Sequence, residues 1–352
     1  MSTDLIIIVT AVLVVIPCAI LGTLLVLRQM AMMGDAISHA VLPGIVLAFF
    51  ITESMGPLVA LLGAGVFGLL TAALVEALKN TGRVREDSSI GVVFTALFAL
   101  GVFLIARYGG NVHLDLNHVL YVEIAFTPLN LLLVGGLTLG PRSFWTLGLV
   151  AALAIAFVWL FYKELKIATF DPALAAAAGF SPVLIHYLLM GAVSMTVVGA
   201  FDAVGAILVV AFLIAPAATA YLLTERLFSM IVLAVVAGTL SAVSGYYLSS
   251  LLDVSVSGMM ASMTGVLFIS ALLFSPSRGL LGAWARRRAN SRRFSGELLA
   301  GRLARLGGRA SEEDLSYELG WDRRDLRRVL GDARRDGVVR AGPGMVELAE
   351  RG

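Results

Sequence analysis

The sequence predicts an all-α polytopic membrane protein with about nine transmembrane helices, followed by a small α+β domain. Three observations lead to this fold class. Hydrophobic residues make up 59% of the chain and charged residues only 14%, with a mean hydropathy of +0.92, whereas soluble domains hold about 45–50% apolar residues. Apolar runs recur at close to the length of about 20 residues that a spanning helix needs. Charge is also divided, since residues 1–283 carry 10 Lys and Arg against 13 Asp and Glu, and residues 284–352 carry 16 against 11.

The predicted spanning helices follow the apolar runs in order. They lie near residues 5–27, 31–52, 57–79, 88–106, 144–162, 183–201, 205–223, 229–250 and 257–275. The apolar stretch 129–139 is too short to span, so we assign it to a long loop over residues 107–143. The first apolar run follows Asp4 rather than a basic segment, and it is longer than the apolar region of a signal peptide. We therefore expect it to be a spanning helix that is not cleaved off.

Basic residues in the connections predict the orientation, because cytoplasmic loops of membrane proteins are enriched in Lys and Arg. With the N-terminus outside, the outer connections hold only Arg107 and Arg142. The inner connections then hold Arg28, Lys79, Arg83, Arg85, Lys163, Lys166, Arg226 and Arg278. We therefore expect a cytoplasmic C-terminal domain.

Three segments are expected along the chain: a transmembrane permease domain over 1–283, a basic juxtamembrane linker over 284–293 and a cytoplasmic domain over 294–352. The last should contain helices near 295–306, after Ser311 and from Asp322 to about Asp336, then strands near 337–340 and 345–348. This pattern resembles winged-helix domains of transcription regulators. Because Asp alternates with Arg in the third helix, nucleic acid is not the expected partner, and we expect an interaction or regulatory module. The basic linker is expected to meet anionic membrane lipid.

Asp35 and His39 are ionisable residues inside the second predicted span, where charge is costly and mostly functional. They are four apart and therefore share one face of a helix. A carboxylate with an imidazole suits manganese, iron or zinc, whereas copper favours thiolate. Two ligands are few, but a symmetric dimer would double the set. The spacing leaves a structural alternative, in which Asp35 caps the helix near Arg28 and His39 donates to a carbonyl.

Residues 34–50, GDAISHAVLPGIVLAFF, closely resemble the signature of the membrane subunits of the zinc and manganese ABC importer family. Residues 81–91 and 205–220 resemble a cytoplasmic loop and a proline-broken late helix of that family. The resemblance implies that Asp35 and His39 coordinate the transported metal. It also implies a bacterial plasma (inner) membrane location, a homodimer of permease subunits, two ABC ATPase subunits and an extracytoplasmic metal-binding protein. No cofactor is expected to stay bound.

A short surface helix is predicted in residues 170–179, FDPALAAAAG, between two spans. Asp171 suits the N-cap, Pro172 the first turn and Gly179 the C-terminal cap. By resemblance, this segment is the coupling helix that docks into the ATPase subunit, which assigns Phe170, Asp171, Pro172, Ala173 and Gly179 to ATPase coupling.

Pro43 and Pro216 lie inside predicted spans, and each removes a backbone hydrogen bond. We expect kinks that serve packing at both positions. Movement during gating is the alternative.

The predicted outer loop contains His113, Asp115, His118 and Glu123. Their oxygen and nitrogen atoms could bind a cation at the transport entrance, or they could contact the metal-delivering protein. The loop resembles the manganese branch of the family more than the zinc branch. Manganese is therefore the favoured substrate, with zinc or iron as alternatives.

The sequence contains no Gly-x-x-x-x-Gly-Lys-Ser/Thr motif that could cradle ATP phosphates, so we expect no enzyme activity in this chain and a separate ATPase subunit. Three other classes stay open. They are a permease for metal chelates such as siderophores or cobalamin, a membrane-anchored DNA-binding sensor, and an ion-driven secondary carrier.

Overall fold

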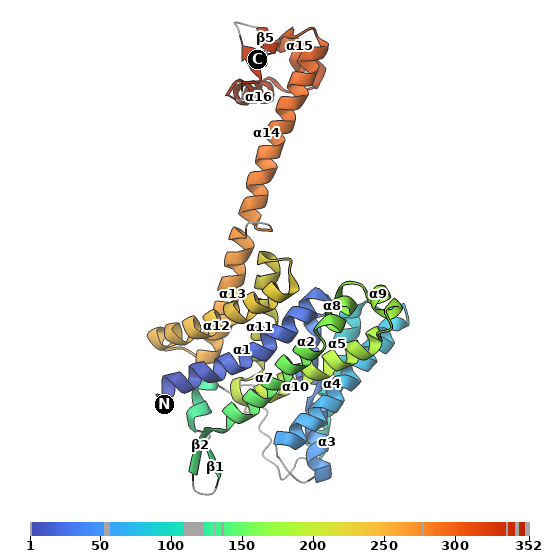
Figure 1. The fold of residues 1–352 in the computed structure, drawn as a ribbon, viewed down its shortest axis with the longest axis vertical. Coiled ribbons are helices and arrows are strands. Elements are labelled where there is room, and N and C mark those ends of the chain that lie inside the picture. The colour runs from blue at the N-terminus through green and yellow to red at the C-terminus, as the bar shows by residue number, and fades with distance from the viewer. Residues whose placement is uncertain are drawn as a thin grey trace. The chain divides into compact units, whose positions relative to one another are not determined.

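The computed structural model describes residues 2–52, 57–108, 123–129, 131–134, 137–275, 278–335, 337–341 and 345–348. The chain forms two compact units, Met1–Leu272 and Leu273–Gly352. Both are drawn in Figure 1.

The first unit is a helical bundle whose long helices match the predicted spans. Within the described residues, nine helical stretches are long and apolar enough to cross a bilayer, which confirms the prediction of about nine. The helices are α1 (Thr3–Leu27), α2 (Ala31–Ala40), α3 (Leu42–Thr52), α4 (Pro57–Asn80), α5 (Glu86–Tyr108), α7 (Arg142–Leu160), α8 (Tyr162–Phe170), α9 (Pro172–Ala177), α10 (Pro182–Val204), α11 (Ala206–Leu223), α12 (Leu227–Leu252) and α13 (Val256–Phe274).

The second span is divided into α2 and α3, which meet at Val41. Pro43 lies in the first turn of α3, where its missing N–H costs least. By contrast, α11 runs through Pro216 as one helix. Of the two prolines predicted to kink a span, only Pro43 therefore lies at a break between helices.

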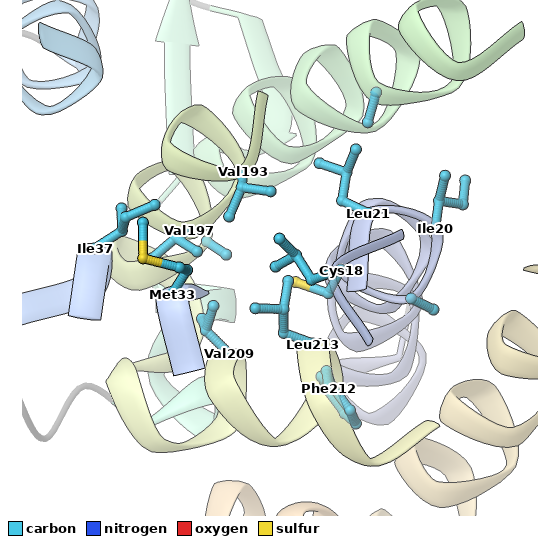
Figure 2. Close-up of a cluster of buried hydrophobic side chains, with 14 of the residues drawn as sticks. Cys18, Ile20, Leu21, Met33, Ile37, Val193, Val197, Val209, Phe212 and Leu213 are labelled. Carbon is cyan, nitrogen blue, oxygen red and sulfur yellow. The ribbon is translucent and has the colours of Figure 1, made fainter. Parts of the chain in front are cut away.

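Helix α1 lies in the centre of the bundle and contacts α7, α10, α11 and α12. Figure 2 shows the apolar cluster at its inner face, where Cys18 and Leu21 meet Met33 of α2, Val193 of α10 and side chains of α11. Small residues permit this close packing. A side chain at Gly22 would collide with the backbone of α11, for example.

The described part of the predicted long loop has regular secondary structure. It contains a 3-10 helix, η1 (Ile124–Leu129), and an antiparallel hairpin of β1 (Leu131–Val134) and β2 (Leu137–Pro141). Neither crosses the bundle, in agreement with the prediction for residues 129–139. The hairpin lies at one end of the bundle, here called the hairpin end, and α8 and α9 lie at the other, the α9 end (Figure 1).

The second unit consists of α14 (Leu280–Arg305), β3 (Arg309–Ser311), α15 (Glu312–Leu319), α16 (Arg323–Arg335), β4 (Val339–Ala341) and β5 (Met345–Leu348). The strands form one antiparallel sheet in the order β3-β5-β4. Residues 284–293, the predicted juxtamembrane linker, are helical, because α14 runs through them without a break. Arginine is a good helix former, so an Arg-rich run can continue a helix.

This unit has a hydrophobic core of its own. Leu299 and Leu303 of α14 pack with Leu315, Leu326 and the buried side chains of the sheet. As predicted, Ser311 caps α15, accepting a hydrogen bond from the Asp314 N–H at 3.1 Å. The elements predicted for this part of the chain are therefore present, with β3 as an addition.

Candidate metal centre

Helix α2 has a single open stripe on an otherwise buried surface. Its buried residues are Met33, Gly34, Ala36, Ile37, Ser38 and Ala40. Gly34 lets α2 lie close to α11, since a side chain there would collide with Leu213. The packing on the far side therefore fixes the direction in which Asp35 and His39 point.

Asp35 and His39 lie next to each other on that stripe, as their spacing predicted. The distance between His39 Nε2 and Asp35 Oδ1 is 3.6 Å, and the side chains are 32% and 35% exposed, respectively. A single ion with ligand bonds of about 2.0–2.2 Å can span such a separation. Neither group is buried beyond reach of an ion, and both lie inside a candidate membrane span, Ala31–Thr52.

Two aromatic rings of α5 hold the imidazole of His39. Its centroid lies 6.1 Å from the ring of Phe94 and 5.9 Å from that of Phe98, the latter in an edge-on arrangement. Such contacts restrict rotation of the imidazole and keep it beside the carboxylate. The sequence did not point to these phenylalanines, because a phenylalanine in a span is typical of lipid contact or packing.

The pair is not a complete metal site within one chain. Among the described residues, no group of three or more His, Cys, Asp or Glu side chains is placed to hold a metal ion. Zinc and manganese sites usually have at least four ligands. Beyond the part of the chain that the structure describes, further ligands would come from the remaining residues, from water or from another molecule.

Of the predicted outer-loop residues, His113, Asp115 and His118 lie outside the described residues. Glu123 has a structural partner, since its Oε1 accepts a hydrogen bond from the Val256 N–H at 2.8 Å. A carboxylate at a helix N-terminus satisfies a free N–H and opposes the helix dipole. Glu123 thus stabilises the start of α13, and its part in metal access stays a prediction.

The α9 segment has the caps that the sequence predicted. The Leu174 N–H donates to Asp171 Oδ1 at 2.9 Å, and Pro172 occupies the first turn. At the other end, the Phe180 N–H donates to the Ala175 carbonyl, and Gly179 has a φ of 87°. A left-handed residue in this position closes the helix, and glycine adopts it without strain.

Apolar side chains stand exposed around α9. Phe170 is 57% exposed and Leu174 is 56% exposed, although α9 lies outside the candidate membrane spans. Val183 and Leu184 are also exposed, but they lie within the candidate span Pro182–Phe201, where lipid can cover them. Exposed apolar groups outside lipid mark a surface for another protein.

Arg28 connects the end of α1 with the end of α8, a contact that the sequence did not predict. Its Nε donates to Thr169 Oγ1 at 3.0 Å, across 141 residues of chain. Burial lowers the pKa of the Arg28 guanidinium. A single sequence carries no signal for such a distant partner, although an arginine directly after an apolar helix marks the position.

Comparison with known proteins finds relatives that are named membrane proteins of metal transport systems. The manganese transport system membrane protein MntD of Bacillus subtilis is 53% identical over 281 residues, which cover 80% of this chain and 95% of MntD. The zinc transport system membrane protein TroD of Treponema pallidum is 41% identical over 348 residues, 97% of this chain and 95% of TroD. The alignment with TroD therefore extends into the second unit.

A solved structure has the same bundle. PsaBC from Streptococcus pneumoniae, in complex with a Fab, matches with a TM-score of 0.66 and 32% identity over 79% of this chain and 94% of the matched chain. The family model described as the ABC 3 transport family matches residues 5–275. With a match of that extent and relatives of this similarity, the chain belongs to the ABC 3 transport family.

Proposed function

We propose that this chain is the membrane-spanning permease subunit of an ATP-driven importer of a divalent metal ion, with manganese as the favoured substrate. The observation that carries the proposal is the Asp35 and His39 pair, which lies 3.6 Å apart on the open stripe of a spanning helix. Ionisable groups in a membrane mark a substrate or ion pathway. Membership of the ABC 3 transport family supports the assignment of this pathway to an ABC transporter.

An incomplete ligand set suits a transporter. A permease must release its ion, and a site with too many ligands would retain it. Two copies of the chain around a shared axis would offer two carboxylates and two imidazoles, a set that suits a borderline divalent ion. We therefore include a homodimer in the proposal, with Asp35 and His39 from both subunits at its centre.

Manganese is favoured over zinc because MntD is named a manganese transport protein and has the higher identity of the two relatives described above. Zinc stays the alternative, since TroD is named a zinc transport protein. Neither ligand type decides the matter, because both ions accept carboxylate and imidazole.

The proposed partners are two ABC ATPase subunits and an extracytoplasmic metal-binding protein. The α9 segment is the proposed ATPase contact. Its capped helix is rigid enough to transmit a force, and Phe170 and Leu174 offer an apolar surface beside it. In this proposal, the α9 end faces the cytoplasm of a bacterial cell, and the hairpin end, with the N-terminus, faces outward.

Metal transport by the complex tests the proposal. The chain, its ATPase and the binding protein would be reconstituted in liposomes, and entry of radioactive manganese, zinc and iron would be followed with ATP inside or absent. We expect ATP-dependent manganese uptake that excess zinc reduces only weakly. Uptake without ATP would support a secondary carrier, and uptake of an intact chelate alone would support the chelate permease.

For the second unit, we propose a winged-helix-like regulatory module. The sequence α15, α16 and the hairpin β4–β5 supports this fold assignment. Exposed arginines along α16 are interleaved with Asp325 and Asp332, which would repel phosphate, and Arg323 pairs with Glu313 at 3.0 Å. An interaction with protein, such as the ATPase subunits or a second copy of the unit, therefore fits better than DNA binding.

Truncation tests this second proposal. Because α14 begins at Leu280, a chain that ends at residue 279 removes the unit without cutting a helix. We expect the truncated chain to insert and to import metal with an altered ATPase rate or regulation. Sequence-specific, salt-resistant DNA binding by the full-length protein would instead support the sensor.

A further inference from the structure

We propose that the hydrogen bond between Arg28 and Thr169 is the link through which movement of α9 reaches Asp35 and His39. The inference rests on the proposed function and deepens it, since it names a positioning contact for transport. Arg28 and Thr169 touch neither ATPase nor metal in this proposal. They connect the two sites that do.

On one side, Thr169 is directly coupled to α9. It is the penultimate residue of α8, and only Asp171 separates α8 from α9. Asp171 also belongs to both helices. Its N–H donates to Ile167 of α8, and its side chain caps α9. A displacement of α9 therefore moves the Thr169 hydroxyl.

On the other side, Arg28 is directly coupled to the metal pair. It caps α1, and α2 begins three residues later at Ala31. The turn between them is fixed, because the Met30 N–H donates to the Leu25 carbonyl at 2.9 Å. A pull on Arg28 is thus passed to the first turn of α2, and α2 carries Asp35 and His39 further along.

Gln29 has an unfavourable backbone conformation in this turn. Its φ is 61°, a left-handed value that is unfavourable for a residue with a side chain. Glycine would adopt it without cost, yet the chain has glutamine. Residues held in such conformations occur where surrounding contacts maintain them and where a segment switches. The backbone hydrogen bond from Met30 to Leu25 closes this turn, and the Arg28 contact lies directly beside it.

The guanidinium of Arg28 is also incompletely bonded. Its Nη2 is buried and has no hydrogen-bond partner among the residues that the structure describes. A buried donor without a partner is costly, so this N–H is available to an acceptor that comes within reach. In this proposal, the donor gains its acceptor in a second state of the transporter, so that closure of the ATPase exchanges bonds at Arg28.

The test compares Thr169→Val with Thr169→Ser in the full complex of permease, ATPase and binding protein. Valine keeps the shape of threonine and removes the acceptor, whereas serine keeps the acceptor and removes a methyl group. The readout is radioactive manganese imported per ATP hydrolysed in liposomes. We expect the ratio to fall about tenfold in Thr169→Val, the size of effect that a charged hydrogen bond supports, and to stay near the wild-type value in Thr169→Ser.

Arg28→Lys provides the second arm, because lysine keeps the charge but cannot place a donor at Nε. It should lower the ratio in the same way, and the double variant should be no worse than the more impaired single variant. An unchanged ratio in Thr169→Val, equal losses in the valine and serine variants, or proportional losses of transport and hydrolysis would overturn the link. If the wild-type complex hydrolyses ATP but imports no metal, the proposed function itself fails.

Discussion

The membrane unit and the C-terminal unit treat charge in opposite ways. In the membrane unit, Asp35 and His39 lie side by side in a spanning helix, and the rings of two phenylalanines contact the imidazole. In the C-terminal unit, charged residues cover the surface, and pairs such as Arg309 with Glu347 are well exposed. Charge is expensive in lipid and cheap in water. A charge therefore says much about function in the first unit and little in the second.

The largest effect that this comparison predicts is at Asp35. Asp35→Asn keeps the shape of the side chain and removes the negative charge that would bind a divalent ion. Loss of a residue that only orients a metal ligand already costs about 10–100-fold in metal affinity or activity, so we expect loss of a ligand to reduce manganese uptake by at least about 100-fold. Uptake into liposomes measures it.

Asp253→Asn is the matched control. Asp253 ends α12, is exposed, and has a φ of 53°, which asparagine tolerates well. The chemical change is the same, but the residue lies at a surface. Wild-type uptake in Asp253→Asn with loss in Asp35→Asn would sharpen the contrast, and equal uptake in both would show that the Asp35 charge has no role in transport.

An intermediate effect is expected at Asp171, where a charge acts through helix capping rather than through an ion. Asp171→Ala removes the acceptor for the Leu174 N–H, which costs about 1 kcal/mol of helix stability. A partly unfolded α9 should transmit less force, so stimulation of ATP hydrolysis by the loaded binding protein should fall several-fold.

Asp171→Asn distinguishes the cap from the charge, because asparagine is an equally good N-cap residue. We expect it to retain stimulation. If Asp171→Asn is as impaired as Asp171→Ala, the carboxylate contacts the ATPase directly, and the capping argument does not hold.

The same contrast explains what could be predicted from the sequence. Spans such as α1 and α12 were predicted to within a few residues, since lipid requires about 20 apolar residues in a row and leaves little choice. The hairpin β1–β2, the short helix α8 and strand β3 were missed. Each is too short for a periodic signal, and packing decides its conformation.

The candidate site was predictable in part for a related reason. Asp35 and His39 are four residues apart, so one helix suffices to bring them together. Phe94 and Phe98, which contact His39, and Thr169, which contacts Arg28, come from distant segments. Only the packing of α2 on α5, and of α1 beside α8, brings these residues together. Such long-range packing cannot be recognised in a single sequence.

The smallest predicted effect concerns the exposed pair of Arg309 and Glu347 in the C-terminal unit. Their Nε and Oε1 atoms lie 3.0 Å apart on paired strands, but the side chains are 71% and 42% exposed. Water and salt screen such a pair, so Arg309→Ala should change stability by less than about 0.5 kcal/mol. Hydrogen exchange of the β3 and β5 amides in the intact protein measures this change in stability.

Leu315→Ala, in the core of the same unit and fully buried, should cost about 2–5 kcal/mol and serves as the positive control. If Arg309→Ala costs as much as Leu315→Ala, charge in this unit is not cheap, and the contrast between the two units fails.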